Sequence, residues 1–245
     1  MPPAVTVVLP AHNEAGMLEQ SVGDVVKGLR ERSRSFEVVV VENGSTDDTA
    51  GIAFRLAGEH PEIRALSLPE PDYGRALRAG LLAAVGDVVV NFDVDFCDLG
   101  FLDRAVPMVE AADGPAVVVG SKRTAGSADT RGWQRRLVTR VFSSLLRFGF
   151  GLTVSDTHGV KAMRRAAVAP LAQHCRNGAD LFDTELILRA ERAGWRIAEI
   201  PVEVVEKRPA RSSMRARIPR TVKGLATLRL LLWRERLPGG RPAVM

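Results

Sequence analysis

Short apolar runs rich in β-branched residues alternate with helix-forming segments through the first half of the chain. This alternation is typical of βαβ units, which build a mainly parallel sheet with helices packed on its faces. The predicted strands are Val5 to Leu9, Phe36 to Val41, Ile63 to Leu68, Asp87 to Phe92 and Ala116 to Val119. The predicted fold class is therefore α/β.

Apolar residues at helical spacing fill the segments between several of these strands. The predicted helices are Glu14 to Arg32, a second helix capped by Ser45, Gly74 to Val85, Trp133 to Phe148 and Asp180 to Ala193. In the second helix Asp47 and Asp48 would occupy the first turn, where carboxylates complement the helix dipole. Ala125 to Arg131 is a predicted loop, and Trp195 to Val205 is a predicted strand broken at Pro201.

The length and the cysteine content favour one large domain in a reducing compartment. A chain of 245 residues can bury its core without disulfides. Cys97 and Cys175 match no redox or metal-ligand spacing, so both are predicted to be buried apolar residues. The N-terminus shows no signal-peptide pattern, and every apolar stretch falls well short of the ~20 residues that cross a bilayer. We therefore expect a cytoplasmic location.

The net charge of +5, from 34 basic and 29 acidic residues, is distributed unevenly. Between Ser121 and Arg176 eleven basic residues stand against two Asp, and from Arg189 to Met245 fourteen stand against five Glu. Such a basic second half suggests phosphate groups, an anionic membrane surface or nucleic acid as partner. Aromatic residues are only 5% of the chain and are not interleaved with the basic ones, which disfavours nucleic acid.

The most informative motif is the apolar strand from Val88 that ends in two carboxylates one residue apart, Asp93 and Asp95. Ligands of open α/β sheets bind outside the carboxyl ends of the strands, which is where these carboxylates lie. Mg²⁺ and Mn²⁺ prefer such hard oxygen ligands and complete their shell with substrate phosphates. The pair therefore indicates a metal and phosphate site, although an Asp-x-Asp pattern alone also fits a solvated turn that caps a helix.

Two further polar loops, Pro10 to Glu14 and Glu42 to Ser45, follow the first two strands. Together with the aspartate motif they share one edge of the sheet, which favours a nucleotide pocket. Asn13 and Ser45 equally fit helix caps, and Gly44 equally fits a turn. The chain has neither a P-loop nor a G-x-G-x-x-G motif, so a metal at the aspartates would have to compensate the phosphate charge.

Seven segments follow one another in a characteristic order: Val7 to Glu14, Val41 to Asp47, Tyr73 to Gly80, Gly86 to Asp95, Val119 to Lys122, Ser155 to Lys161 and Glu199 to Val202. In this order they resemble glycosyltransferase family 2, and most closely its dolichyl-phosphate mannose synthases and related polyprenyl-phosphate sugar transferases. The resemblance covers residues 4 to 212. It implies the GT-A fold, with a mainly parallel central sheet flanked by helices. It also implies an inverting enzyme that moves a hexose, mannose or glucose, from a nucleotide-diphosphate sugar to a polyprenyl or dolichyl phosphate.

The resemblance further implies roles for individual residues. Pro10, Asn13, Glu14 and Asn43 would line the base and ribose pocket, Asp93 would face the nucleotide, and Asp95 would bind Mg²⁺ or Mn²⁺ with Asp98 in its shell. Lys122, Arg135 and Thr139 fall where such synthases hold the acceptor phosphate, and Arg208 or Arg211 falls where a basic segment closes over the donor. The implied catalytic set is Asp93, Asp95, Lys122, Arg135 and Arg208, and the implied donor is GDP-mannose or UDP-glucose.

Four positions depart from the usual family pattern. The family usually has Asp where Asn43 stands, Arg where Lys122 stands, and Gly-Phe-Arg or Gly-Phe-Lys where Gly159 to Lys161 stands. The usual Arg-x-x-Gly-x-Ser-Lys segment has become Arg208 to Met214. These departures concern the base, the sugar and the acceptor rather than the fold.

The acceptor decides which residues catalysis needs. A phosphate monoester has a second pKa of about 6 and is largely ionised near neutral pH, so a lipid phosphate needs no strong general base. A hydroxyl acceptor, on a glycan or a small molecule, would need a base, for which Asp183 and Glu185 are the candidates. A nucleotidyltransferase would show a first loop rich in Gly and Lys, and Pro10 to Glu14 contains neither. A non-enzymatic basic binding module is the remaining alternative.

The last 33 residues, 213–245, form a predicted tail after a transferase domain over residues 1–212. Apolar and basic residues mix between Arg215 and Arg236, which fits a basic amphipathic helix on an anionic membrane surface with Trp233 near the interface. A helix packed on the domain fits the same pattern. A lipid acceptor would then be reached by peripheral docking on the cytoplasmic membrane face or through a membrane partner subunit.

Overall fold

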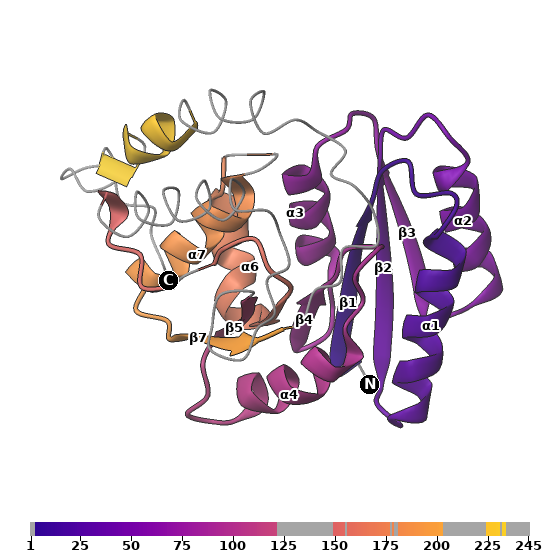
Figure 1. The fold of residues 1–245 in the computed structure, drawn as a ribbon, viewed down its shortest axis with the longest axis horizontal. Coiled ribbons are helices and arrows are strands. Elements are labelled where there is room, and N and C mark those ends of the chain that lie inside the picture. Colours follow the sequence, from indigo (N-terminus) through magenta and orange to yellow (C-terminus); the bar gives the residue numbers. More distant parts are fainter. Residues whose placement is uncertain are drawn as a thin grey trace, which may run out of the picture.

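The computed structural model describes residues 3–121, 149–154, 156–176, 178, 181–202, 224–230 and 232–233. Within these residues one sheet of seven strands has the order β3-β2-β1-β4-β6-β5-β7 (Figure 1). The strands are β1 (Val5–Ala11), β2 (Phe36–Asn43), β3 (Ile63–Leu68), β4 (Val88–Asn91), β5 (Val117–Ser121), β6 (Lys161–Arg164) and β7 (Ile197–Pro201). All neighbouring pairs are parallel except those that involve β6, so the sheet is mainly parallel, as predicted.

Helices cover both faces of the sheet, which makes three layers. The helices are α1 (Leu18–Glu31), α2 (Thr49–Glu59), α3 (Tyr73–Ala83), α4 (Leu99–Glu110), α6 (Arg165–His174) and α7 (Phe182–Arg192). Buried side chains of α1, α2 and α4 join one hydrophobic cluster, and those of α3, α6 and α7 join a second cluster on the other face. The two-sided cover is the arrangement that the alternating sequence pattern predicts.

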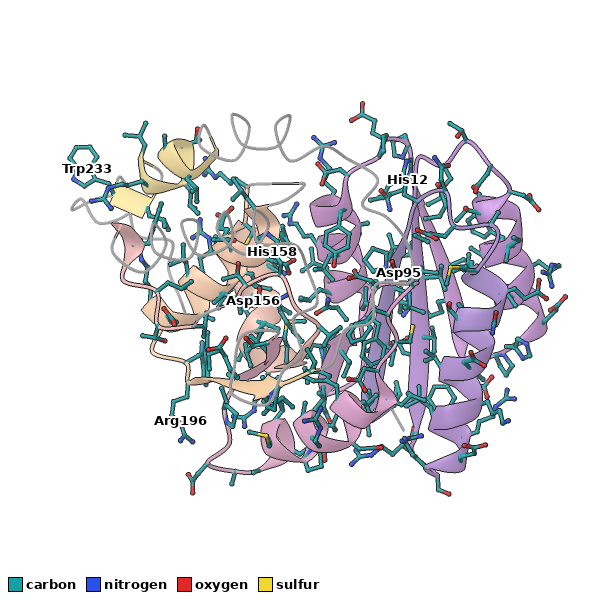
Figure 2. All side chains as sticks on the ribbon, in the orientation of Figure 1. His12, Asp95, Asp156, His158, Arg196 and Trp233 are labelled. Carbon is teal, nitrogen blue, oxygen red and sulfur yellow. The ribbon has the colours of Figure 1, made fainter. Side chains whose placement is uncertain are left out.

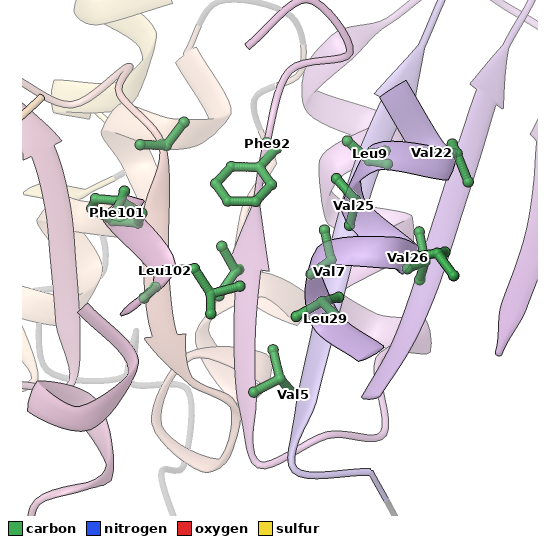
Figure 3. Packing of buried hydrophobic residues seen from close by; sticks show 14 of the residues in the cluster. Val5, Val7, Leu9, Val22, Val25, Val26, Leu29, Phe92, Phe101 and Leu102 are labelled. Atoms are coloured by element: carbon green, nitrogen blue, oxygen red, sulfur yellow. The ribbon is translucent and has the colours of Figure 1, made fainter. Parts of the chain in front are cut away.

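The alternation of side chains along β1 shows how the sheet separates the two clusters. Val5, Val7 and Leu9 belong to the first cluster, whereas Val8 belongs to the second. Figure 3 shows the first cluster, where these β1 side chains pack against the apolar face of α1 and against Phe92. Each fully buried aliphatic or aromatic side chain of this kind stabilises the fold by about 1.5–3 kcal/mol. The core therefore fixes the strand ends, and with them the loops that carry the polar residues.

The predicted cap at Ser45 is wrong. α2 begins at Thr49 with Asp48 at the cap position, so Asp47 and Asp48 precede the helix instead of filling its first turn. Ser45 Oγ accepts a hydrogen bond from the Asn13 N–H at 3.0 Å. The serine thus joins the loops after β1 and β2, a contact that the local sequence cannot reveal.

The sequence pattern also does not predict α4, α6 or β6. Both helices contain a proline, Pro107 and Pro170, and proline normally interrupts the helical signal. β6 has only four residues and begins with a lysine, so it lacks the apolar run of a central strand. Of the two cysteines, Cys175 is buried as predicted, but Cys97 is only half-buried.

Residues 224–230 and 232–233 form a short C-terminal helix that packs on the domain. Leu225, Leu228 and Leu232 are buried in the second cluster. Leu230 and Trp233 are 46% and 58% exposed, and Trp233 projects outward from this helix (Figure 2). The predicted helix over Trp133 to Phe148, the loop over Ala125 to Arg131 and the domain boundary after residue 212 lie outside the described residues.

Candidate active site

The loop between β4 and α4 carries Asp93, predicted to face the nucleotide, and the two predicted metal ligands Asp95 and Asp98. Phe92 and Val94 are buried, so strand-like alternation turns Asp93 and Asp95 to the other side, where both are half-buried. The Phe96 N–H donates to Asp93 O at 2.9 Å, and Ser21 Oγ donates to Val94 O at 2.6 Å. These contacts hold the loop directly after the carboxyl end of β4, and Figure 2 shows Asp95 below His12, which follows β1.

Asp98 caps the helix that follows this loop. Its Oδ1 accepts a hydrogen bond from the Phe101 N–H at 2.8 Å. The helix-cap interpretation of the motif therefore applies to Asp98, whereas neither Asp93 nor Asp95 is the cap residue of a described helix. The role of Asp98 as a metal ligand stays a prediction. Its Oδ1 is engaged in the helix cap, so Oδ2 would be the oxygen that binds the metal.

Asp93 lies within a group of charged and polar side chains from four elements. The Tyr73 hydroxyl, at the start of α3, donates to Asp93 Oδ1 at 3.0 Å. Burial raises the pKa of Asp93, and the Asp95 and Asp183 carboxylates raise it further, while the Tyr73 hydrogen bond and the Lys161 ammonium oppose the change. A cation placed beside these carboxylates would relieve their repulsion.

The donor set fits a hard divalent cation. Asp93 and Asp95 offer carboxylate oxygens, and the buried Oδ1 of Asn91, two residues before Asp93, accepts no hydrogen bond from the part of the chain that the structure describes. No group of three or more His, Cys, Asp or Glu side chains arranged for a metal occurs among the described residues. An ion with so few protein ligands would be Mg²⁺ or Mn²⁺ completed by substrate phosphates, rather than a structural metal in a protein cage.

The loops after β1 and β2 are held together by hydrogen bonds. Asn13 adopts a left-handed conformation (φ 54°), its N–H donates to Ser45 Oγ, and its Oδ1 accepts from the Thr46 N–H at 2.8 Å. The Glu14 N–H donates to Thr49 Oγ1 at 2.8 Å. Pro10, by contrast, is buried within β1. The predicted nucleotide residues Asn13 and Glu14 thus lie in the loop after β1, which is hydrogen-bonded to the loop after β2. Pro10 lies in β1, just before this loop.

Glu42 fixes the second of these loops. Its carboxylate accepts hydrogen bonds from the Ser45 N–H at 2.5 Å and from Ser67 Oγ at 2.6 Å. Although burial opposes the change, these hydrogen bonds hold the pKa of Glu42 below its usual value. The ionised carboxylate therefore stabilises the loop at neutral pH.

Asn43 joins two strand ends and the start of a helix. Its Nδ2 donates to Ala11 O at 2.9 Å, and its Oδ1 accepts from the Asp72 N–H at 3.1 Å. The side chain is only 3% exposed. An aspartate, which the family usually has here, could not donate to the Ala11 carbonyl. Asn43 therefore connects the end of β2 to β1 and to the start of α3.

Two buried ion pairs involve α7: the first joins it to β6 and is not apparent from the sequence, and the second has the i,i+4 spacing of a pair within one helix. The Lys161 ammonium lies 2.8 Å from Asp183 Oδ1 without the alignment of a hydrogen bond, and it donates to Gly159 O at 2.7 Å. Glu185 and Arg189 form the second pair at 2.8 Å. Lys161 and Glu185 are fully buried. Both candidate general bases are thus already paired with a cation.

Tyr73 is a site residue that sequence reasoning assigns no role, and its ionisation can be measured alone because it is the only tyrosine in the chain. Burial raises its pKa well above the usual value of 10.0, and the Asp93 carboxylate adds to this effect. The folded state therefore holds the phenolic proton more tightly than the unfolded state. The resulting stabilisation is complete below pH 10.0 and is lost as the pH rises toward the folded pKa.

We expect the ultraviolet absorbance of tyrosinate to develop at a higher pH in the native protein than in the same protein unfolded in urea. A Tyr73→Phe variant identifies the signal, since it should show no titration at all. Overlapping titration curves for native and unfolded protein would contradict the buried, hydrogen-bonded phenol.

Five predicted site residues lie outside the described residues, namely Lys122, Arg135, Thr139, Arg208 and its alternative Arg211. The described Ser121 ends β5 and is buried directly before Lys122. Their roles at the acceptor and the donor remain predictions.

Comparison with known proteins decides the family. A family model described as "Glycosyl transferase family 2" matches residues 6–170. The chain belongs to glycosyl transferase family 2. The family 2 assignment confirms the resemblance that the seven sequence segments carry.

Two relatives indicate the breadth of the family. The glycosyltransferase AglD of Haloferax volcanii is 35% identical over 204 residues, which are 81% of this chain but only 32% of AglD. The chain therefore spans about a third of the length of that relative. The dolichyl-phosphate beta-glucosyltransferase ALG5C of Trichomonas vaginalis is 29% identical over 215 residues, with 81% of this chain and 63% of the relative covered.

A solved structure supports the fold. Glucosyl-3-phosphoglycerate synthase from Mycobacterium tuberculosis, crystallised with Mn²⁺, UDP and phosphoglyceric acid, matches with a TM-score of 0.68 and 26% identity over 96% of this chain and 80% of that chain. This family 2 chain accordingly has the GT-A fold, with a mixed central sheet flanked by helices.

Proposed function

We propose that the chain is a metal-dependent, inverting hexosyltransferase that uses a nucleotide-diphosphate sugar as donor and a polyprenyl or dolichyl phosphate as acceptor. The observation that carries the proposal is the position of Asp93 and Asp95 directly after β4, where Tyr73 and Asn43 connect Asp93 to the ends of β1 and β2. In a family 2 glycosyltransferase this is where a nucleotide diphosphate and its cation belong.

Asp95 would hold Mg²⁺ or Mn²⁺, with Asp98 as a further ligand. When bound, the cation would neutralise the diphosphate and stabilise the charge of the leaving nucleoside diphosphate. Asp93 would face the nucleotide, and the loop residues Pro10, Asn13, Glu14 and Asn43 would form the walls of the base and ribose pocket. GDP-mannose and UDP-glucose are the donors to test first.

The acceptor assignment rests on charge. Asp183 and Glu185, the two carboxylates that could serve as a general base, are buried and paired with Lys161 and Arg189. An acceptor that is already ionised needs no general base, which fits the pairing of these two carboxylates. The similarity to a dolichyl-phosphate beta-glucosyltransferase supports the same choice. Lys122, Arg135 and Thr139 would hold the acceptor phosphate, and Arg208 would close over the donor.

A donor panel tests the first half of the proposal. Thermal unfolding and hydrolysis would be followed with nucleotide sugars of each base, with Mg²⁺, Mn²⁺ or a chelator. A cognate donor present at a hundred times its Kd stabilises the folded state by about 2.7 kcal/mol. The proposal requires this stabilisation for at least one donor and its loss with the chelator. A flat response to all donors would refute it.

Arg135→Ala tests the acceptor site. A charge-assisted hydrogen bond to phosphate contributes about 1.5–3 kcal/mol, so the variant should use a polyprenyl phosphate roughly ten- to a hundredfold less well. Donor affinity should change little, because Asn13, Asp93 and the cation govern it. Kinetics with a polyprenyl phosphate and with the matching polyprenol measure both effects. Equal rates for the two wild-type acceptors, or a loss of donor affinity in the variant, would reject the lipid phosphate.

A hydroxyl acceptor is the second candidate. The similarity to a synthase crystallised with phosphoglyceric acid favours it, because that small molecule carries a free hydroxyl group. Phosphoglyceric acid therefore belongs in the acceptor panel beside the lipid phosphate. Turnover of the small molecule without turnover of the lipid would move the assignment to this second candidate.

The C-terminal helix suggests how a lipid acceptor would be reached. No helix among the described residues is long and apolar enough to cross a membrane. Leu230 and Trp233 nevertheless leave apolar surface exposed on the side of the helix away from Leu228. We expect peripheral docking on the cytoplasmic membrane face, either directly or with a membrane partner subunit.

After sedimentation with anionic vesicles, the wild-type chain should be found in the pellet, and a Leu230→Ser, Trp233→Ser variant should remain in the supernatant. Equal recovery of both would exclude direct docking through this helix.

A further inference from the structure

We propose that Tyr73 is a positioning residue, which fixes the position of the Asp93 carboxylate relative to the loops after β1 and β2, here called the nucleotide loops. This inference deepens the proposed function and rests on it. The Tyr73 hydroxyl donates to Asp93 Oδ1 at 3.0 Å, and both side chains are half-buried. The contact joins the start of α3 to the aspartate motif that follows β4.

The start of α3 is itself fixed to the nucleotide loops. Asn43 Oδ1 accepts from the Asp72 N–H at 3.1 Å, and Asp72 caps the helix by accepting from the Arg75 N–H at 2.9 Å. Gly44 brings the β2 loop into backbone contact with this segment: a Cβ at Gly44 would lie 2.7 Å from Pro71 N. Tyr73, the first residue of α3, is therefore rigidly placed relative to the end of β2.

A continuous line of contacts results. It runs from Ala11 O at the end of β1, through the Asn43 side chain at the end of β2, to Asp72 and Tyr73, and ends at Asp93 after β4. The line connects the three strand ends around which the proposed nucleotide site is built. A shift of the Asp93 carboxylate would thus be resisted by the same residues that shape the loops.

Asp93 needs such a restraint because carboxylates surround it. Asp95 and Asp183 both repel its negative charge. Without the Tyr73 hydroxyl, repulsion would favour rotation of the Asp93 side chain toward solvent. Phe at this position would keep the ring packed and would remove only the donor, so the hydroxyl can be tested apart from the ring.

Calorimetry with a nucleoside diphosphate and Mn²⁺, using UDP and GDP as probes, tests the inference without turnover. We expect Tyr73→Phe to bind the preferred probe about ten- to a hundredfold more weakly, which is the range for a lost hydrogen bond to a charged group. The melting temperature should change little. In kinetics, the donor KM should rise more than kcat falls.

The matched control is Thr6→Val. The Thr6 hydroxyl also donates to a carboxylate, Glu37 Oε1, at 2.6 Å, but it lies in β1 near the opposite end of the sheet. This variant should lower stability and leave nucleotide affinity unchanged.

A second measurement uses the single tyrosine. With fluorotyrosine incorporated, the fluorine NMR spectrum contains one protein resonance, from Tyr73. Addition of the preferred probe with Mg²⁺ should shift it. A wild-type chain that binds a probe while Tyr73→Phe binds it equally well would overturn this inference alone. Failure of the wild-type chain to bind either probe would overturn the proposed function and this inference together.

Discussion

Asp95→Ala should abolish sugar transfer and leave the fold intact. A bound cation lowers the free energy of a charged transition state by several kcal/mol. Loss of its carboxylate ligand should therefore lower kcat/KM by about a thousandfold or more. Asp95 lies half-buried on the loop between β4 and α4, outside both hydrophobic clusters. Surface substitutions away from the core usually change stability by about 0.5 kcal/mol or less. Activity with Mg²⁺ or Mn²⁺ and the urea midpoint of unfolding measure the two effects.

Asp113→Ala is the matched control for this experiment. Asp113 is an exposed carboxylate after the other end of α4, and its removal changes the net charge equally. The control should keep wild-type activity and wild-type metal dependence. The metal role of Asp95 is wrong if Asp95→Ala retains near wild-type activity in the presence of a chelator.

The strands that carry the site could be predicted because their signal is local. β1 to β5 are apolar runs, and the polar loops after β1, β2 and β4 follow directly from where those runs end. The helix face of α1 is likewise buried at the positions that helical spacing selects, namely Leu18, Val22, Val25, Val26 and Leu29. Parallel strand order then places the three loops at one edge, so the location of the site follows from the sequence.

The contacts within the site could not be predicted in this way. Tyr73 reaches Asp93 across 20 positions of sequence, and Asn43 reaches Asp72 across 29. Ser45 has the local pattern of a helix cap, yet its hydroxyl accepts from the Asn13 N–H, 32 positions away. In each case the partner is distant in the sequence, and the contact depends on which loops the fold brings together.

β6 illustrates the same limit at the level of the fold. Its lysine would be expected at the surface, because Lys is almost never fully buried unless it is paired. Only the structure supplies the pair, since Asp183 comes from α7 and lies 22 positions along the chain. β6, which is antiparallel to β4 and β5, therefore carries a buried positive charge on Lys161, and Asp183 of α7 neutralises it.

Lys161→Met should destabilise the protein by several times the effect of a typical surface substitution. The Lys161 side chain is fully buried and the Asp183 side chain is 4% exposed, with 2.8 Å between their charged atoms. Removal of one partner leaves a buried charge without compensation, which typically costs about 3–5 kcal/mol. The free energy of unfolding, measured by urea denaturation, should fall by this amount.

Two controls separate the loss of pairing from the loss of the side chain. In the double variant Lys161→Met, Asp183→Leu no unpaired charge remains, and apolar replacement of a whole buried pair is often neutral or stabilising. Most of the lost stability should therefore return. Arg55→Met removes one partner of an exposed pair at a similar distance, 2.7 Å from Glu19, and should change the free energy of unfolding little. If Lys161→Met were as stable as the wild type, or if the double variant were less stable than Lys161→Met, the pair would not be the buried, mutually dependent contact that its geometry indicates. If the double variant regains stability but binds the nucleotide donor more weakly than the wild type, the pair also acts on the neighbouring Asp93 through electrostatics.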